Sequence, residues 1–200
     1  MKHTNDPTIR FALLEHLNRT HRRDKKVRII EELGVKHGTT RVDVAVVNGI
    51  MHGYEIKSDK DTLRRLPKQM SSFNLIFDKL TLVVGKNHLY DAINMLPDWW
   101  GIIIAKINKN DSVIFNHIRE GEINVNQDST SLARLLWKEE ALNILRERNQ
   151  ASGYNSKPRE AIYKKLSTIL DHKTLGDKVR ETLFVRRDWR PDSPLMLNGG

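Results

Sequence analysis

The feature that most constrains the fold of this chain is a β-hairpin signal between residues 41 and 59. Residues 41–47, RVDVAVV, alternate in polarity and are rich in β-branched side chains, which is typical of a strand. Asn48-Gly49 is a strong turn signal, and residues 50–59, IMHGYEIKSD, supply a second strand. The segment therefore predicts two antiparallel strands joined around Asn48-Gly49.

Hydrophobic periodicity elsewhere predicts an α/β fold followed by a helical extension. Residues 27–35 are compatible with a strand or a helix end, and we favour a strand. We expect residues 1–130 to form the α/β core and residues 131–200 to form the extension. The other predicted elements are a helix over 7–18 with Asp6 as N-cap, a helix over 59–77 kinked at Pro67, a strand over 79–85, a helix over 88–97, strands over 100–107 and 113–118, and helices over 131–149, 157–171 and 174–188.

Composition narrows the functional classes. A chain of 200 residues suits one medium domain, or a compact core with a small extension. The absence of cysteine excludes disulfides and thiolate zinc sites, and the longest apolar run, residues 99–105, is too short to cross a bilayer. We therefore expect a soluble, cytoplasmic protein without a membrane partner. A formal net charge of +9 favours a polyanionic partner, with nucleic acid first.

The hairpin also carries the residues with the clearest chemistry. Asp43 lies in the first strand, and Glu55 and Lys57 lie in the second. Because side chains alternate along a strand, Glu55 and Lys57 share one face and Ile56 points to the other. Two carboxylates with a backbone carbonyl form the hard oxygen site that Mg²⁺ prefers. The alternative is a set of cross-strand ion pairs that only solubilises a sheet, and for an isolated Glu-x-Lys this alternative is the commoner one.

The length of the hairpin loop decides whether such a site can form. A two-residue Asn48-Gly49 loop would send Asp43 and Glu55 to opposite faces of the sheet. The loop must therefore hold an odd number of residues, with Gly49 left-handed in a three-residue loop, or a bulge must shift the register near Gly53.

With these residues in place, the sequence resembles the PD-(D/E)xK nuclease superfamily. The matching residues are Val42-Asp43, Glu55-x-Lys57 and an upstream acid in Glu31-Glu32. Within that superfamily, the run from Glu31 to Gln69, the later LPDWWGI and the terminal VRRDWR are similar to a bacterial family of unassigned biological role.

The resemblance implies a restriction-endonuclease-like core, a mixed β-sheet flanked by helices, and a metal-dependent nuclease. It implies that Asp43, Glu55 and the Ile56 carbonyl bind Mg²⁺, for which Mn²⁺ is expected to substitute. Lys57 would position the attacking water or stabilise charge on the phosphate, and either Glu32 or Glu31 would complete the metal shell. Gln69 resembles the glutamine of the Q-x-x-x-Y motif of RecB-like members, although Phe73 replaces the tyrosine.

Basic residues on the helix that follows the Glu55 strand suit contact with phosphates. Arg64, Arg65 and Lys68 flank the expected site in sequence, and their alternative role is that of a solvated face. We therefore expect a Mg²⁺-dependent nuclease that acts on DNA, with RNA left open. The competing hypothesis is a nucleic-acid-binding or interaction protein that uses the same fold without catalysis.

Overall fold

A computed structural model describes residues 3–187 of the chain. The order of elements in the core is the predicted one, a helix, three strands, then helix, strand, helix and two strands. The elements are α1 (Asp6–Thr20), β1 (Arg28–Val35), β2 (Thr40–Val47), β3 (Met51–Lys57), η1 (Leu63–Arg65), α2 (Leu66–Phe73), β4 (Lys79–Gly85), η2 (Lys86–His88), α3 (Leu89–Met95), β5 (Gly101–Ile107), β6 (Val113–Arg119), α4 (Ser129–Ala133), α5 (Lys138–Glu147), α6 (Arg159–Ile169) and α7 (His172–Val185).

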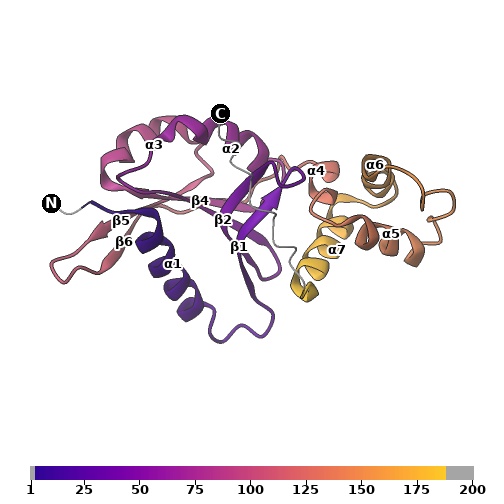
Figure 1. Cartoon of the computed structure of the whole chain (residues 1–200), viewed down its shortest axis with the longest axis horizontal. Helices are drawn as coiled ribbons and strands as arrows, with labels where there is room; N and C mark the ends of the chain where they lie inside the picture. Colours follow the sequence, from indigo (N-terminus) through magenta and orange to yellow (C-terminus); the bar gives the residue numbers. More distant parts are fainter. Residues whose placement is uncertain (1–2, 188–200) are drawn as a thin grey trace, which may run out of the picture.

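The strands form one mixed six-stranded sheet in sequence order, β1-β2-β3-β4-β5-β6 (Figure 1). Strands β3, β4 and β5 are parallel, because the helices α2 and α3 connect them, and the remaining pairs are antiparallel. The central strands are buried on both faces, which is why their sequences are nearly continuous apolar runs. The predicted α/β class, a mixed sheet flanked by helices with further C-terminal helices, is confirmed.

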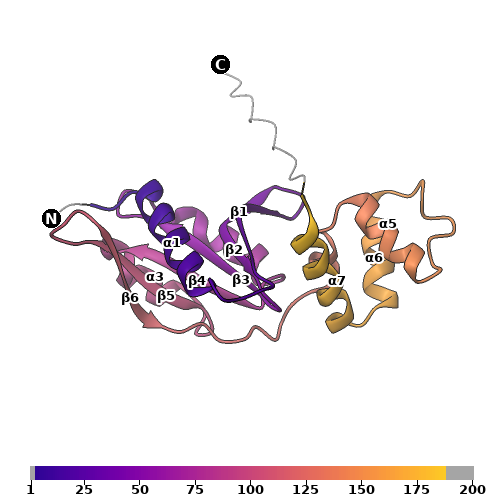
Figure 2. The same ribbon diagram turned by 90° about the horizontal axis from the view of Figure 1, so that it is seen from below.

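Two hydrophobic layers cover the two faces of the sheet. On one face, Ile9 and Leu13 of α1 pack with Val44 and Ile56 of the hairpin. On the other face, α2 and α3 and the C-terminal helices share a second and larger core. Figure 2 shows α1 on its own side of the sheet. Alternate residues of the hairpin therefore face different helices, and Glu55 and Lys57 face α2.

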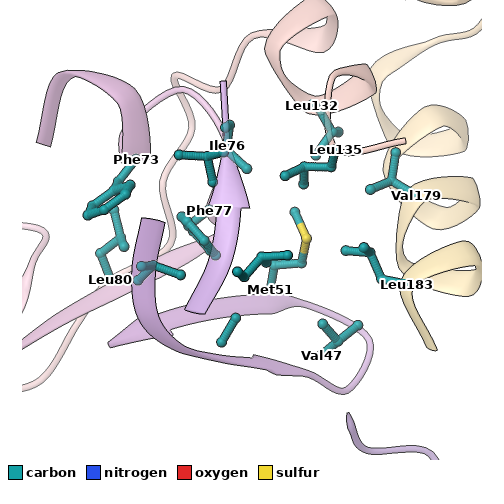
Figure 3. Close-up of a cluster of buried hydrophobic side chains, with 14 of the residues drawn as sticks. Val47, Met51, Phe73, Ile76, Phe77, Leu80, Leu132, Leu135, Val179 and Leu183 are labelled. Carbon is teal, nitrogen blue, oxygen red and sulfur yellow. The ribbon is translucent and has the colours of Figure 1, made fainter. Parts of the chain in front are cut away.

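The larger core continues from the sheet into the C-terminal helices. Val47 and Met51 at the hairpin end pack with Leu135 of the α4–α5 connection and with Val179 and Leu183 of α7 (Figure 3). The same buried cluster therefore belongs to both parts of the chain. The division at residue 130 stays a prediction, and residues 188–200 of the predicted extension lie outside the described residues.

The structure corrects the predicted boundaries of three helices. Asn5, not Asp6, caps α1, because its side chain accepts the Thr8 N–H at 3.0 Å. The predicted helix over 59–77 is shorter, and Pro67 lies in the first turn of α2, where a missing N–H breaks no helical bond.

The predicted helix over 131–149 is interrupted, since α4 ends at Ala133 and α5 begins at Lys138. The Glu140 carboxylate accepts the Trp137 N–H at 2.6 Å and so begins a new helix there. The predicted end of the last helix, residue 188, lies outside the described residues. Within residues 3–187, no helix combines the length and apolar character needed to cross a membrane.

Candidate functional site

The hairpin register brings three acidic positions into one row across the sheet. Val47 pairs with Met51, so the loop holds three residues, Asn48, Gly49 and Ile50, with Gly49 at φ +97°. The odd-numbered loop with a left-handed Gly49 is therefore confirmed. Continuing the register places Asp43 opposite Glu55, and the pairs of β1 with β2 place Glu32 opposite Asp43.

No bulge occurs near Gly53, which pairs in register with Ala45 and Leu80. The glycine has a packing reason instead. A Cβ atom at this position would lie 2.8 Å from Leu80 Cδ2 and 3.2 Å from the Phe77 ring, so any larger residue would force these buried side chains to shift. The loop alone sets the register of the hairpin.

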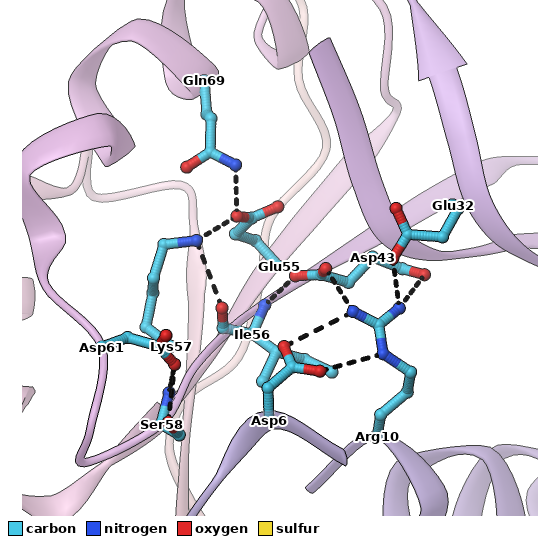
Figure 4. Close-up of polar contacts among 10 residues, drawn as sticks. All are labelled: Asp6, Arg10, Glu32, Asp43, Glu55, Ile56, Lys57, Ser58, Asp61 and Gln69. Carbon is cyan, nitrogen blue, oxygen red and sulfur yellow. Dashed lines mark hydrogen bonds and ion pairs between the residues drawn. The ribbon is translucent and has the colours of Figure 1, made fainter. Parts of the chain in front are cut away.

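Glu55 is the most enclosed carboxylate of the row, with a side chain 1% exposed. Its Oε1 atom is ion-paired with Lys57 Nζ and accepts Gln69 Nε2 at 2.5 Å (Figure 4). Its Oε2 atom is buried and has no hydrogen-bond partner in the described part of the chain. Burial, and then the charge of Asp43, raise the pKa of Glu55, and the nearby Lys57 opposes this.

Lys57 and Gln69 hold Glu55 from two elements. Lys57 Nζ also donates to the Ile56 carbonyl at 3.2 Å, so the lysine joins two of the predicted metal donors. Gln69 reaches the site from α2, and its Oε1 atom is buried without a hydrogen-bond partner among residues 3–187. Phe73, one helical turn further on, is fully buried in the core and packs α2 against the sheet.

Asp43 is held by the backbone of β3 and by an arginine that the sequence analysis missed. Its Oδ2 atom accepts the Ile56 N–H at 2.6 Å, and its Oδ1 atom lies 2.6 Å from Arg10 Nη2 of α1. Arg10 Nη1 lies 2.8 Å from Glu32 Oε1, and Arg10 Nε lies 3.1 Å from Asp6 Oδ1 (Figure 4). The four-residue spacing of Asp6 and Arg10 on one helix signals their own ion pair, but no sequence pattern indicates the contact of Arg10 with Asp43.

These side chains line a hollow of about 350 Å³. Arg65 and Lys68 lie on its wall, whereas Arg64 lines a separate hollow beside α3. Of the two candidate acids in β1, Glu32 lines this hollow and Glu31 lines only the neighbouring groove. The predicted residues brought together are Glu32, Asp43, Glu55, Ile56, Lys57, Arg65, Lys68 and Gln69.

The donor set fits a hard divalent cation in part. Glu55 Oε2 and Gln69 Oε1 are buried oxygens without hydrogen-bond partners, and magnesium is bound by oxygens of this kind. In contrast, Arg10 lies between Asp43 and Glu32 and is ion-paired with both. Among residues 3–187, no three histidine, cysteine or acidic side chains are grouped closely enough to hold a metal ion. Binding a cation at Asp43 would therefore require Arg10 to give up part of its contact.

The comparison with known proteins decides the family. The family model described as bacteriophage P4 protein cII matches residues 1–192. The chain belongs to the bacteriophage P4 protein cII family. Protein cII of Enterobacteria phage P4 is 27% identical to it over 157 residues, which is 78% of this chain and 57% of the phage protein. The chain thus spans little more than half the length of this curated relative.

A solved structure of a protein of unknown function from Silicibacter pomeroyi is also similar to the chain. The two share 18% sequence identity with a TM-score of 0.43, over 76% of this chain and 94% of the other. The stretch matched to the protein cII family contains every side chain of the site, from Asp6 on α1 to Gln69 on α2.

Proposed function

We propose that this protein is a Mg²⁺-dependent nuclease that hydrolyses phosphodiester bonds, with DNA as its substrate and the cytoplasm as its location. One observation carries the proposal. A buried carboxylate oxygen, Glu55 Oε2, has no partner among the described residues and lies in the hollow that also holds Asp43 and Lys57. An unpaired buried polar atom costs about 1–3 kcal/mol, so this oxygen supports a ligand that binds there.

The residues of the site have distinct roles in this proposal. Asp43, Glu55 and the Ile56 carbonyl would hold Mg²⁺, which supplies charge stabilisation and lowers the pKa of water. Gln69 and Lys57 hold the Glu55 carboxylate in one orientation. Lys57 would offer its positive charge to the phosphate in the transition state. Arg65 and Lys68 on the wall of the hollow bind flanking phosphates.

A second candidate function is nucleic-acid binding without cleavage. The observation that favours it is Arg10, whose guanidinium is ion-paired with Asp43 and Glu32 where a bound cation would otherwise lie. A site whose acids already have this internal counter-ion can bind phosphate through Arg65 and Lys68 and perform no hydrolysis. The two functions differ in one measurable respect, the dependence of DNA cleavage on added metal.

Metal-dependent cleavage by a matched pair of variants tests the proposal. We expect the wild-type protein to cleave plasmid, linear duplex or single-stranded DNA with Mg²⁺ or Mn²⁺ and to lose this activity in EDTA. Glu55→Gln keeps the side-chain volume but removes a carboxylate that only the site uses. We expect it to lower the cleavage rate at least 100-fold, because several kcal/mol of transition-state stabilisation depend on a bound metal.

Glu15→Gln serves as the control, because Glu15 is an exposed residue of α1 outside the site. It carries the same chemical change and should cleave at the wild-type rate. Full activity in Glu55→Gln, or cleavage that persists in EDTA, would contradict the proposed metal site. DNA binding without cleavage under any metal condition would favour the second candidate function.

A further inference from the structure

A second and larger hollow adjoins the site. It is a groove of about 900 Å³ between the edge strand β1 and the helices α4–α7. Figure 1 shows β1 at the side of the sheet that faces these helices. Glu32 and Arg41 line both this groove and the smaller hollow of Asp43 and Glu55. The groove is therefore continuous with the candidate site.

The walls of the groove are strongly basic. Two acidic residues, Glu31 and Glu32, face six cationic ones, so the lining has a formal net charge of +4 with His37 neutral. Two of the six, Arg134 and Arg186, are ion-paired with Glu160 and Glu140 behind the lining, which leaves a formal charge of +2 when these two acids are included. The cationic residues are Arg28, Arg41, Arg134, Lys138, Arg159 and Arg186. A positive channel that leads into a phosphodiesterase-like site is the electrostatic arrangement that nucleic acid requires.

Part of this charge fixes the shape of the groove. Arg28 Nη1 donates to the Phe184 carbonyl at 2.7 Å and so connects β1 with α7. Glu160 of α6 accepts a 2.9 Å bond from Arg134 Nη2 and lies 2.6 Å from His37 Nε2 in the β1–β2 turn. These contacts connect the β1 side of the groove with α6 and α7.

Two other cations of the lining have no such structural use. Lys138 and Arg159 are the first residues of α5 and α6. The helix dipole disfavours a positive charge at this end, so the helices gain nothing from these cations. Neither side chain has an ion pair or a hydrogen bond among residues 3–187 that would explain it. Their charge is available to an anion in the groove.

We propose that this groove binds the phosphodiester backbone of the nucleic acid next to the scissile bond, through Lys138 and Arg159. In this proposal the C-terminal helices form part of the substrate-binding surface. The nucleic acid lies in the groove between these helices and β1. This inference rests on the proposed nuclease function for its biological meaning, although nucleic-acid binding by the groove is measurable without cleavage.

The salt dependence of nucleic-acid binding tests whether the groove contacts the phosphodiester backbone. Fluorescence anisotropy would measure the affinity of the full chain, in EDTA, for labelled single-stranded DNA, duplex DNA and single-stranded RNA at several salt concentrations. We expect Lys138→Gln/Arg159→Gln to flatten the slope of log affinity against log salt by about 1.8 on duplex and about 1.4 on single strands, because two phosphate contacts are lost. The strand type with the highest wild-type affinity identifies the substrate class.

A matched double variant provides the control. Arg148→Gln/Lys164→Gln removes one arginine and one lysine from exposed positions of the same helical part, outside the groove. It should keep the wild-type slope. The inference is overturned if the groove variant keeps the wild-type slope, if both double variants flatten it equally, or if the wild-type protein binds none of the three probes. Thermal melting of each variant shows that the fold is retained.

A small substrate separates this inference from the proposed function. Hydrolysis of bis(p-nitrophenyl) phosphate with Mn²⁺ needs the site but no groove, so the groove variant should hydrolyse it at the wild-type rate. A lower rate in that variant would mean that the groove residues act on the site, and this would overturn their assignment to the backbone. Groove binding with no hydrolysis of any substrate would instead remove the nuclease function and leave the groove in place.

Discussion

At the scale of single residues, the charge balance of the site depends on Arg10. Its guanidinium contacts Asp6, Glu32 and Asp43, so one positive charge faces three negative ones. Burial acts to lower the pKa of Arg10, but hydrogen bonds and charges from Asp6 and Asp43 outweigh it and raise the pKa. The arginine is therefore the internal counter-ion of the acidic row, and it competes with any cation that Asp43 would bind.

Removing Arg10 should weaken the metal-free protein. We expect Arg10→Gln to lower the free energy of unfolding in EDTA by about 2 kcal/mol, because partly buried carboxylates lose a charged hydrogen-bond partner. For a chain of this size the melting temperature should fall by roughly 4–8 °C. Added Mg²⁺ should then raise the melting temperature of the variant more than that of the wild type.

Arg23→Gln is the control for this measurement, because Arg23 is an exposed residue after α1. It should leave both the melting temperature and the Mg²⁺ response unchanged. An Arg10→Gln protein that melts like the wild type in EDTA would show that the ion pairs do not stabilise the fold.

At the scale of elements, the three-residue loop of the hairpin positions the site. Gly49 adopts φ +97°, a conformation that other residues rarely adopt, and this permits the odd-numbered loop. The loop sets the pairing of β2 with β3, and that pairing puts Asp43 opposite Glu55. The conformation of Gly49 therefore determines that Asp43 and Glu55 lie opposite each other in the hairpin.

Substitution of Gly49 should destabilise the protein only because other residues disfavour its positive φ. No other atom lies within 4 Å of the position that a Cβ would take, so there is no steric clash. We expect Gly49→Ala to lower the free energy of unfolding in urea by about 1–2 kcal/mol. Gly49→Asn should lose less, because asparagine tolerates positive φ. Equal stability of the wild type and Gly49→Ala would contradict the left-handed loop.

At the scale of the whole molecule, the sheet and the C-terminal helices share one hydrophobic core. Leu183 at the end of α7 is fully buried in the cluster that contains Val47 and Met51. The groove proposed above lies between these same two parts, so their packing also sets its width. Such continuity favours cooperative unfolding of the described chain as one unit.

Two truncations at the end of α7 test this continuity. We expect Leu183→Ala to destabilise the whole chain by about 2–5 kcal/mol, because it leaves a cavity in the shared core. Val185→Ala changes a side chain that is 68% exposed, so it should shift the stability by less than about 0.5 kcal/mol. Circular dichroism and tryptophan fluorescence should report one coincident transition. Separate transitions for the sheet and the helices would show two independent units.

The sequence by itself determined the order of elements in the core and which acidic residues of the hairpin share a face. Because side chains alternate along a strand, Glu55 and Lys57 were expected on one face. Asp43 could reach that face only if the hairpin loop held an odd number of residues. These features depend on periodicity and turn geometry, which act over a few residues and are therefore visible in a single chain.

Only the tertiary structure decided which residues from distant segments complete the site. It brought Arg10 of α1 to Asp43, selected Glu32 over Glu31, and turned Arg65 but not Arg64 toward the hollow. It also interrupted the helix after Ala133 and opened a basic groove beside β1. These outcomes depend on packing between elements far apart in the chain. A local pattern of residues does not show which distant side chain a buried charge will contact.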